Sequence, residues 1–278
     1  MGAYVPQVLT RYWWECIRVL GPYLVPAQNR FHNVINHTRH PILGRGDHFE
    51  TSRYCGSLDP RTGRREPTPA PGRPCHPRRL GLLLAPLGDT EIVSVVSGVG
   101  KVFCASATQL LIARFAPGEM YMTGICGGLQ DELLGESLVV PERFYQHDVE
   151  SPATPGDPFD LYQGRSTGYE PDARLLQRFR EFSASSTRAH FGVVVSGDHR
   201  IRSAERREAL RRAFGAIAVD QELAAFAHVC TVNCVSFLGI KAVSDNANEL
   251  TEQQQKRHKL KACDAASSAL IGYLSSAK

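Results

Sequence analysis

Two glycine-rich segments, each preceded by a short apolar run, constrain the fold of this 278-residue chain more than any other feature. Residues 97–100 (SGVG) follow an apolar run at 93–96, which is typical of a buried strand. Residues 124–128 (GICGG) follow a second short apolar run at 121–123. Glycine lets the backbone turn sharply and approach a ligand closely. We therefore expect two glycine turns at the ends of neighbouring strands, joined by a helix at residues 101–115, with a small-molecule site beside them.

Beyond residue 81, apolar runs that are typical of strands alternate with runs that are typical of helices. Strands are expected at residues 82–84, 91–96, 136–141, 190–195, 216–219 and 235–243. Helices are expected at residues 172–182, 203–214, 223–230 and 256–274. This alternation predicts an α/β fold: a single domain with a central mixed sheet flanked by helices, preceded by an irregular N-terminal segment.

The N-terminal third has a different composition, and we divide the chain accordingly. Residues 1–58 form an N-terminal segment of uncertain structure, with apolar side chains at roughly helical spacing: Val5, Val8, Leu9, Trp13, Trp14, Ile17 and Leu20. Residues 59–80 are rich in Pro and Arg, a composition that favours a disordered linker. Residues 81–278 form the predicted α/β domain.

Charge is distributed unevenly along the chain. Residues 1–80 hold 12 Arg, no Lys and 5 acidic residues, a net charge of +7, and the remaining 20 basic and 23 acidic residues give −3, so the total is +4. A basic arm of this kind could contact nucleic acid, but we favour a poorly ordered leader. No apolar run approaches the ~20 residues that span a bilayer. We therefore expect neither a nucleic-acid partner nor a membrane.

The eight cysteines predict a reducing compartment and no metal site. No two of them form a C-x-x-C pair, and none is near a His at zinc-binding spacing. Five His fall in the first 80 residues, but their spacing fits no standard ligand set. We interpret the cysteines as reduced thiols of a cytoplasmic protein that needs no cofactor.

Three carboxylates stand directly after apolar strands and are the first candidates for chemistry. They are Asp198 in VVVSGD, Glu222 in AIAVDQE and Asp245 in IKAVSDNA. Strand ends can bring such groups to one edge of a sheet, where a partly buried carboxyl can act as a general acid. The alternative for each is that it caps the following helix.

Six motifs occur in order along residues 81–275: SGVGKVFCASATQLL, TGICGGL, ESLVVPERFYQHDVE, VVSGDHRI, AIAVDQELAAFAHVC and IKAVSDNAN. This succession resembles the nucleoside phosphorylase superfamily, and within it the methylthioadenosine/S-adenosylhomocysteine nucleosidases. The resemblance implies hydrolysis of the N-glycosidic bond of a purine nucleoside, such as 5′-methylthioadenosine or S-adenosylhomocysteine, with release of adenine.

The resemblance also implies roles for individual residues. Asp245 would protonate N7 of the purine, and Glu222 would hold the ribose hydroxyls and stabilise the positive charge that develops on the sugar. Ser244 would orient Asp245. The substrate-binding positions that the resemblance implies are Ile125, Gly127, Arg200, Ile201, Gln221 and Ser244.

Four positions depart from the family pattern. Ile125 stands where the family usually has Ser, Arg200 where an aromatic residue commonly stacks on the purine, and Gln221 where a Met lies under the ribose. The glutamate that activates water has no clear counterpart, and Glu50 is only a weak candidate.

Two alternatives to a nucleosidase stay open. A phosphate-dependent purine nucleoside phosphorylase would carry an Arg two residues before the second glycine turn, where this chain has Met122. A non-catalytic member would bind a nucleoside without turnover. The resemblance further implies a homodimer whose partner is a small-molecule nucleoside.

Overall fold

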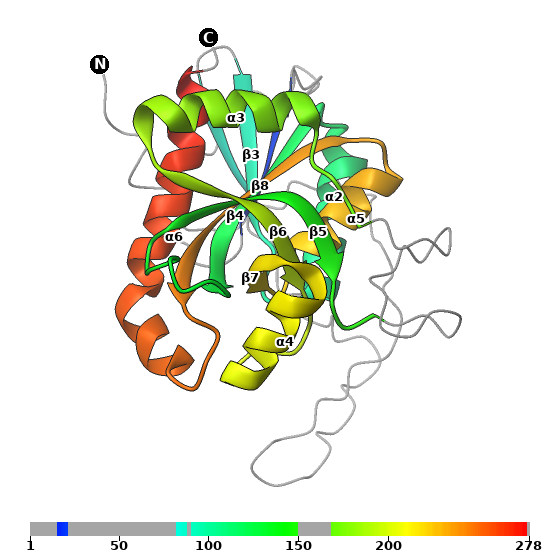
Figure 1. The fold of residues 1–278 in the computed structure, drawn as a ribbon. Helices are drawn as coiled ribbons and strands as arrows, with labels where there is room; N and C mark the ends of the chain where they lie inside the picture. Colours follow the sequence, from blue (N-terminus) through cyan, green and yellow to red (C-terminus); the bar gives the residue numbers. More distant parts are fainter. Residues whose placement is uncertain (1–15, 22–81, 88–89, 150–167, 277–278) are drawn as a thin grey trace, which may run out of the picture. The chain divides into compact units, whose positions relative to one another are not determined.

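The computed structural model describes residues 16–21, 82–87, 90–149 and 168–276, and the features below are those of these residues (Figure 1). The strands are β1 (Cys16–Gly21), β2 (Leu82–Leu87), β3 (Thr90–Val96), β4 (Glu119–Gly128), β5 (Leu138–Gln146), β6 (Ala189–Ser196), β7 (Ala216–Asp220) and β8 (Ser236–Asp245). The helices are α2 (Lys101–Phe115), α3 (Ala173–Ser186), α4 (Ala204–Phe214), α5 (Leu223–Val232) and α6 (Thr251–Ser276).

The strands form one mixed sheet in the order β2-β3-β1-β4-β7-β6-β5-β8. Strand β4 also pairs with β8 in parallel, so that β4, β7, β6, β5 and β8 close into a ring. The pairs β5–β6 and β6–β7 are parallel, whereas β4–β7 and β5–β8 are antiparallel and overlap by two residue pairs each. The predicted α/β fold with a central mixed sheet and flanking helices is confirmed.

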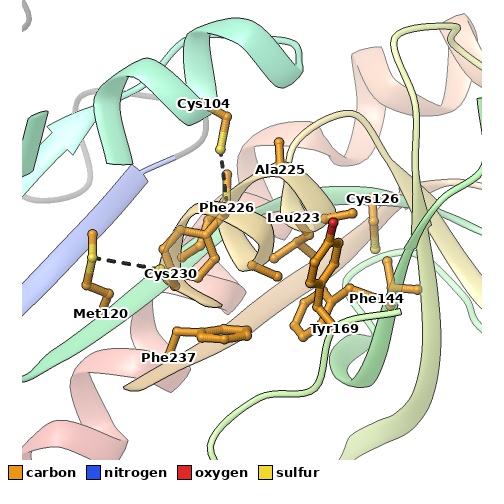
Figure 2. Packing of buried hydrophobic residues seen from close by; sticks show 14 of the residues in the cluster. Cys104, Met120, Cys126, Phe144, Tyr169, Leu223, Ala225, Phe226, Cys230 and Phe237 are labelled. Carbon is orange, nitrogen blue, oxygen red and sulfur yellow. Dashed lines mark hydrogen bonds between the residues drawn. The ribbon is translucent and has the colours of Figure 1, made fainter. Parts of the chain in front are cut away.

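Helices cover the sheet on two sides and bury two main apolar clusters. Residues of α2 and α5 pack on one face, and residues of α3 and α6 pack on the other. Figure 2 shows the first cluster, in which Cys104 of α2 lies over Phe226 and Cys230 of α5. Cys230 Sγ lies 3.9 Å from Met120 Sδ of β4, which joins α5 to the strand at the centre of the sheet. Within the described ranges, no helix has the length and apolar character needed to cross a bilayer.

Two helices begin where side chains can satisfy their first backbone N–H groups. Asp172 precedes α3 and accepts hydrogen bonds from the backbone N–H groups of Arg174 and Leu175. Ser203 precedes α4 and accepts one from Arg206 N. These caps explain why both predicted helix starts agree with the structure to within a residue. The last helix begins earlier than the predicted residue 256, at Thr251.

The structure corrects two predictions about glycine turns and one about the N-terminal segment. Residues 124–128 lie inside β4 rather than in a turn after it. Strands β3 and β4 are not neighbours, because β1 lies between them and runs antiparallel to both. The helical spacing that we noted around Ile17 and Leu20 does not correspond to a helix, because residues 16–21 form strand β1. The predicted division of the chain at residues 58 and 81 falls outside the described residues.

Candidate active site

Strand β4 is the element that brings the predicted acidic residues together. Its residue Gly127 pairs with Val219 of β7 on one side and with Asp245 of β8 on the other. A Cβ atom at Gly127 would lie 3.2 Å from Asp245 Oδ1 and 3.4 Å from a Val219 methyl, so only a glycine fits here without displacement. The ends of β7 and β8 therefore meet across one residue of β4, and Glu222 follows the end of β7 by two residues.

The thiol of Cys126, the neighbour of Gly127, lies close enough to Asp220 and Asp245 at these strand ends for their charges to affect its pKa. Burial raises the pKa of Cys126, and the carboxylates of Asp220 and Asp245 raise it further. A thiol so perturbed stays protonated at neutral pH and has no nucleophilic character. The carboxylates, and not the cysteine, are therefore the candidate catalytic groups of this site.

Glu222 is buried, with 3% of its surface exposed, directly before α5. Its Oε1 accepts a hydrogen bond of 2.9 Å from the backbone N–H of Gly100, the residue that precedes α2. Asp198 Oδ1 accepts the next N–H, from Lys101, also at 2.9 Å. The first glycine turn thus supplies two free backbone donors of a helix N-terminus to two of the predicted carboxylates.

Lys241 was missed by the sequence analysis although it lies at the centre of the site. Its side chain is fully buried on β8, and its Nζ lies 3.0 Å from Asp220 Oδ2 and 3.4 Å from Glu222 Oε2. The signal was present, because a lysine inside the apolar run 235–243 needs a buried partner. When all three groups are ionised, the trio carries one net negative charge.

Burial dominates the protonation of this trio. It raises the pKa of Glu222, and the neighbouring Asp220 raises it further. It also raises the pKa of Asp220 to about 7, against hydrogen bonds from Ser196 and from the backbone that act in the opposite direction. It lowers the pKa of Lys241 well below its ordinary value. A carboxylate in such a place is poorly solvated, and a cation that arrives beside it is stabilised strongly.

Asp245 accepts four hydrogen bonds. Its Oδ2 receives them from Ser244 Oγ and Gln255 Nε2, both at 2.8 Å. Its Oδ1 receives them from the backbone N–H of Ala247 at 3.0 Å and from Thr251 Oγ1 at 3.2 Å. Gln255 and Thr251 belong to α6 and were missed because their motif gives no local sign of a contact with the end of β8.

The remaining predicted residues lie at different distances from these carboxylates. Ile201 is buried among residues under α4, and Gln221 donates from Nε2 to the carbonyl of Asp198 at 3.1 Å. Arg200 is exposed and donates from Nη2 to Gln255 Oε1. Ile125 is the exception: it packs on the face covered by α3 and α6, whereas the adjacent Cys126 belongs to the opposite cluster.

Neither the depression that the structure shows nor a metal cluster among the described residues marks this site. A shallow depression of about 540 Å³ lies elsewhere, lined by residues such as Ser137, Phe182, His190 and Ala269, and no predicted site residue borders it. Among the described residues, no three His, Cys, Asp or Glu side chains are grouped as metal ligands would be. Glu50, the weak candidate for the base, lies outside the described residues. The buried carboxylates are therefore what identifies the site.

Comparison with known proteins gives one family. The family model described as "Phosphorylase superfamily" matches residues 64–277. The 5′-methylthioadenosine/S-adenosylhomocysteine nucleosidase of Staphylococcus aureus is 32% identical over 164 residues, which is 58% of this chain and 72% of that protein.

Solved structures agree in fold. The nucleosidase of the same name from Neisseria meningitidis, in complex with methylthio-immucillin-A, has a TM-score of 0.67 and 27% identity, over 71% of this chain and 87% of its own. The futalosine hydrolase of Helicobacter pylori has a TM-score of 0.64 and 26% identity, over 71% of this chain and 89% of its own.

Proposed function

Because the chain belongs to the phosphorylase superfamily, we propose that it hydrolyses the N-glycosidic bond of a purine nucleoside, with 5′-methylthioadenosine or S-adenosylhomocysteine as substrate and adenine as product. One observation carries the proposal: Asp245 at the end of β8 and Glu222, two residues after the end of β7, are both buried, and these two strand ends meet across Gly127. Relatives that bear the nucleosidase name are similar over most of their length.

Glu222 has the properties that the sugar half of the reaction needs. Cleavage of an N-glycosidic bond passes through a sugar with oxocarbenium character, so a fixed negative charge beside the ribose lowers the barrier. Gly100 N–H and Lys241 hold the Glu222 carboxylate in place at 2.9 and 3.4 Å. Because these partners are buried and already oriented, little reorganisation is needed as the charge develops.

Asp245 has the properties that the departing base needs. A purine anion is a poor leaving group, and a proton delivered to its N7 makes it a better one. Ser244, Ala247, Thr251 and Gln255 fix the Asp245 carboxyl by hydrogen bonds of 2.8 to 3.2 Å. Of the substrate-binding positions, Gly127, Arg200, Ile201, Gln221 and Ser244 lie on the loops and strand ends around these two carboxylates, and Ile125 lies on the other face of β4.

Water rather than phosphate is the acceptor that we propose. A phosphate dianion needs a cation, but Met122, at the position where a phosphorylase would carry an Arg, is fully buried in the apolar cluster under α2 and α5. The non-catalytic alternative has less support, because it leaves the buried and oriented pair Glu222 and Asp245 without a role.

The test uses the full chain and 5′-methylthioadenosine. Adenine release is monitored by chromatography, with and without inorganic phosphate. We expect adenine and the unphosphorylated 5-methylthioribose as products, and a rate of release that does not depend on phosphate. A rate that requires phosphate, with a sugar 1-phosphate as product, would establish the phosphorylase instead. Binding of the nucleoside without any release would establish the non-catalytic alternative.

A homodimer in the cytoplasm completes the proposal. Helix α2 and the turn before it expose Val99, Val102, Phe103 and Leu110, of which Val102 is 75% and Phe103 58% exposed. Apolar side chains gathered on one exposed helix favour association with another surface. We assign this surface to a second copy of the chain.

A further inference from the structure

Three hydrogen bonds among three residues form a closed network that joins the start of α2 to the turns after β5 and β6. Lys101 Nζ, at the start of α2, donates to Asp148 Oδ1 at 2.6 Å. Asp148 Oδ2 accepts from the backbone N–H of Asp198 at 2.8 Å, and Asp198 Oδ1 accepts from the backbone N–H of Lys101 at 2.9 Å. Asp148 and Asp198 each follow their strand by two residues, so this three-residue network fixes one helix start and two strand ends.

The network is partly shielded from water. The side chains of Lys101 and Asp148 are 16% and 18% exposed, so solvent screens this ion pair less than a pair on the open surface. Lys101 Nζ also donates to Gln146 Oε1 at 3.2 Å. Burial acts to raise the pKa of Asp148, but the hydrogen bonds from Lys101 and from the backbone of Asp198 outweigh it and lower the pKa. Asp148 is therefore ionised at neutral pH and accepts both hydrogen bonds.

The residue before Lys101 makes the contact that matters for the proposed chemistry. Gly100 donates its backbone N–H to Glu222 Oε1 at 2.9 Å, and Lys101 donates the next N–H to Asp198. Only the φ and ψ angles of Gly100 separate these two N–H groups, and its φ of 100° lies in the region that favours glycine. Glycine does not hold one conformation by itself. The direction of the Gly100 N–H therefore depends on how firmly the next residue is held.

A further contact joins the network to the loop that carries Glu222. Gln221, the residue before Glu222, donates from Nε2 to the carbonyl oxygen of Asp198 at 3.1 Å. Asp198 thus uses its N–H, its carbonyl and one carboxylate oxygen to join the segments around it. The network therefore constrains both the donor that Glu222 accepts and the loop on which Glu222 lies.

We propose that Lys101, Asp148 and Asp198 are positioning residues, which hold the first glycine turn so that its N–H group meets the carboxylate that stabilises the sugar. That N–H belongs to Gly100, and the carboxylate is Glu222. The inference rests on the proposed function, in which a fixed charge beside the ribose lowers the barrier because little reorganisation is needed. Asp198, a candidate for chemistry in the sequence, thereby holds a turn in place and does not act as an acid.

The first test measures the Gly100 N–H itself and needs no turnover. Residues 99–100 are the only Val–Gly pair in the sequence, so 13C-carbonyl valine and 15N-glycine label one peptide group of the full-length protein. The network variant, Lys101→Met/Asp148→Ala, removes two of the three hydrogen bonds without changing the net charge. We expect the Gly100 amide to exchange its hydrogen at least about tenfold faster in this variant, because the N–H is no longer held on Glu222.

The matched control removes an ion pair elsewhere. Arg180→Met/Glu142→Ala also leaves the net charge unchanged, and its two side chains, on α3 and β5, are 37% and 44% exposed. Exposed pairs contribute little to stability, so the Gly100 amide should exchange at the wild-type rate in this control. Equal exchange rates in the wild type and the network variant would overturn the inference.

The second test asks whether the network acts through Glu222. A double-mutant cycle compares kcat/KM for adenine release when the network variant is made in the wild type and in Glu222→Gln. We expect a loss of about tenfold in the wild type and of less than about twofold in Glu222→Gln, where no charge remains to be positioned.

The two possible failures of this cycle are distinguishable. Equal losses in the two backgrounds would show a general effect on the fold and would overturn the inference. Absence of adenine release by the wild type would instead remove the proposed function. The exchange rate of the Gly100 amide would then still decide whether the network holds the contact with Glu222.

Discussion

Lys241 is the residue on which the electrostatics of the site depend. It is buried against Asp220 and Glu222, and in the described part of the chain it is the cationic side chain with which both carboxyls pair. Removing one partner of a buried ion pair leaves an uncompensated charge, which costs about 3–5 kcal/mol. We therefore predict that Lys241→Met destabilises the protein by that amount at pH 8.

The pH dependence of this variant follows from the pKa directions. Burial raises the pKa of Asp220 to about 7, above the unfolded value of about 3.9, so its contribution to stability is complete below pH ~4 and is lost as the pH rises through ~7. The lowered pKa of Lys241 acts in the opposite sense, because its contribution is present at high pH and is lost as the pH falls through its folded pKa. Lys241→Met removes that opposing contribution.

Urea unfolding at pH 5.5 and pH 8 checks this prediction. The stability of Lys241→Met should fall more steeply between these pH values than that of the wild type. Lys261→Met, at a side chain that is 72% exposed, should behave as the wild type. A loss of stability in Lys241→Met that is the same at both pH values would show that packing, and not charge, dominates.

Glu222 gives the second prediction at this scale. Glu222→Gln keeps the shape and the acceptor for Gly100 N–H but removes the negative charge beside the developing cation. We expect kcat/KM for adenine release to fall by about 10²–10³, which is more than any change in the stability of the folded variant explains. Glu132→Gln, at an exposed position, is the matched control. A Glu222→Gln variant as active as the control would exclude the charge of Glu222 from the mechanism.

Individual site residues were predictable from the sequence to different degrees. Glu222 and Asp245 stood out because each follows an apolar strand within a recognisable motif. Lys241 and Gln255 did not, since their importance arises from contacts with residues that are distant in the sequence, such as Asp220 and Arg200. A buried lysine could have been suspected from the strand, whereas the contacts of Gln255 could not.

Among the elements, β4 carries a closely packed glycine, Gly127, where β7 and β8 meet it on either side. A Cβ atom there would come within 3.0 Å of Ala247 Cβ and 3.2 Å of Asp245 Oδ1. We predict that Gly127→Ala destabilises the protein by about 1–3 kcal/mol, because strand β7 or β8 must move. Thermal and urea unfolding measure the loss, and kcat for adenine release should fall further than this loss explains.

Gly118 offers a control for that substitution, since a Cβ atom there meets nothing within 4 Å. Gly118→Ala should leave stability within about 0.5 kcal/mol of the wild type, as is usual for an exposed position. If both alanine variants behaved alike, the close approach of β7 and β8 to β4 would not be a constraint on the site.

Element prediction succeeded where the hydrophobic pattern was long and failed where glycine interrupted it. Helix α2 was predicted with its observed bounds, and the helices predicted to begin at residues 172 and 203 begin one residue later, after the caps Asp172 and Ser203. Strand β4 continues through residues 124–128 because neighbouring strands supply hydrogen-bond partners that a local pattern does not reveal. Strand β1 was missed because six residues within a longer apolar stretch carry little periodicity.

At the scale of the molecule, the order of the strands in the sheet could not be predicted from the sequence. The ring closed by β4 and β8 depends on pairings between segments about 120 residues apart, such as Gly127 and Asp245. The class of fold followed from the alternation of apolar and amphipathic runs. The ring had to be observed, because loop lengths and local patterns allow many orders of the same strands.

The exposed surface of α2 gives the prediction at this scale. We expect the double variant Val102→Asp/Phe103→Asp to be a monomer, because two charges on the proposed interface oppose its burial. Size-exclusion chromatography with light scattering gives the mass directly. Leu134→Asp, at another exposed apolar position outside α2, should retain the dimer. A wild-type mass of one chain at micromolar concentration would contradict the dimer itself.

The central claim is that Asp245 and Glu222 act on the two halves of one nucleoside. The rate of adenine release from 5′-methylthioadenosine by wild type, Asp245→Asn and Glu222→Gln, each shown to be folded by circular dichroism, tests it most directly. We predict turnover by the wild type and losses of at least about 100-fold in both variants. Equal rates in all three folded proteins would contradict the account.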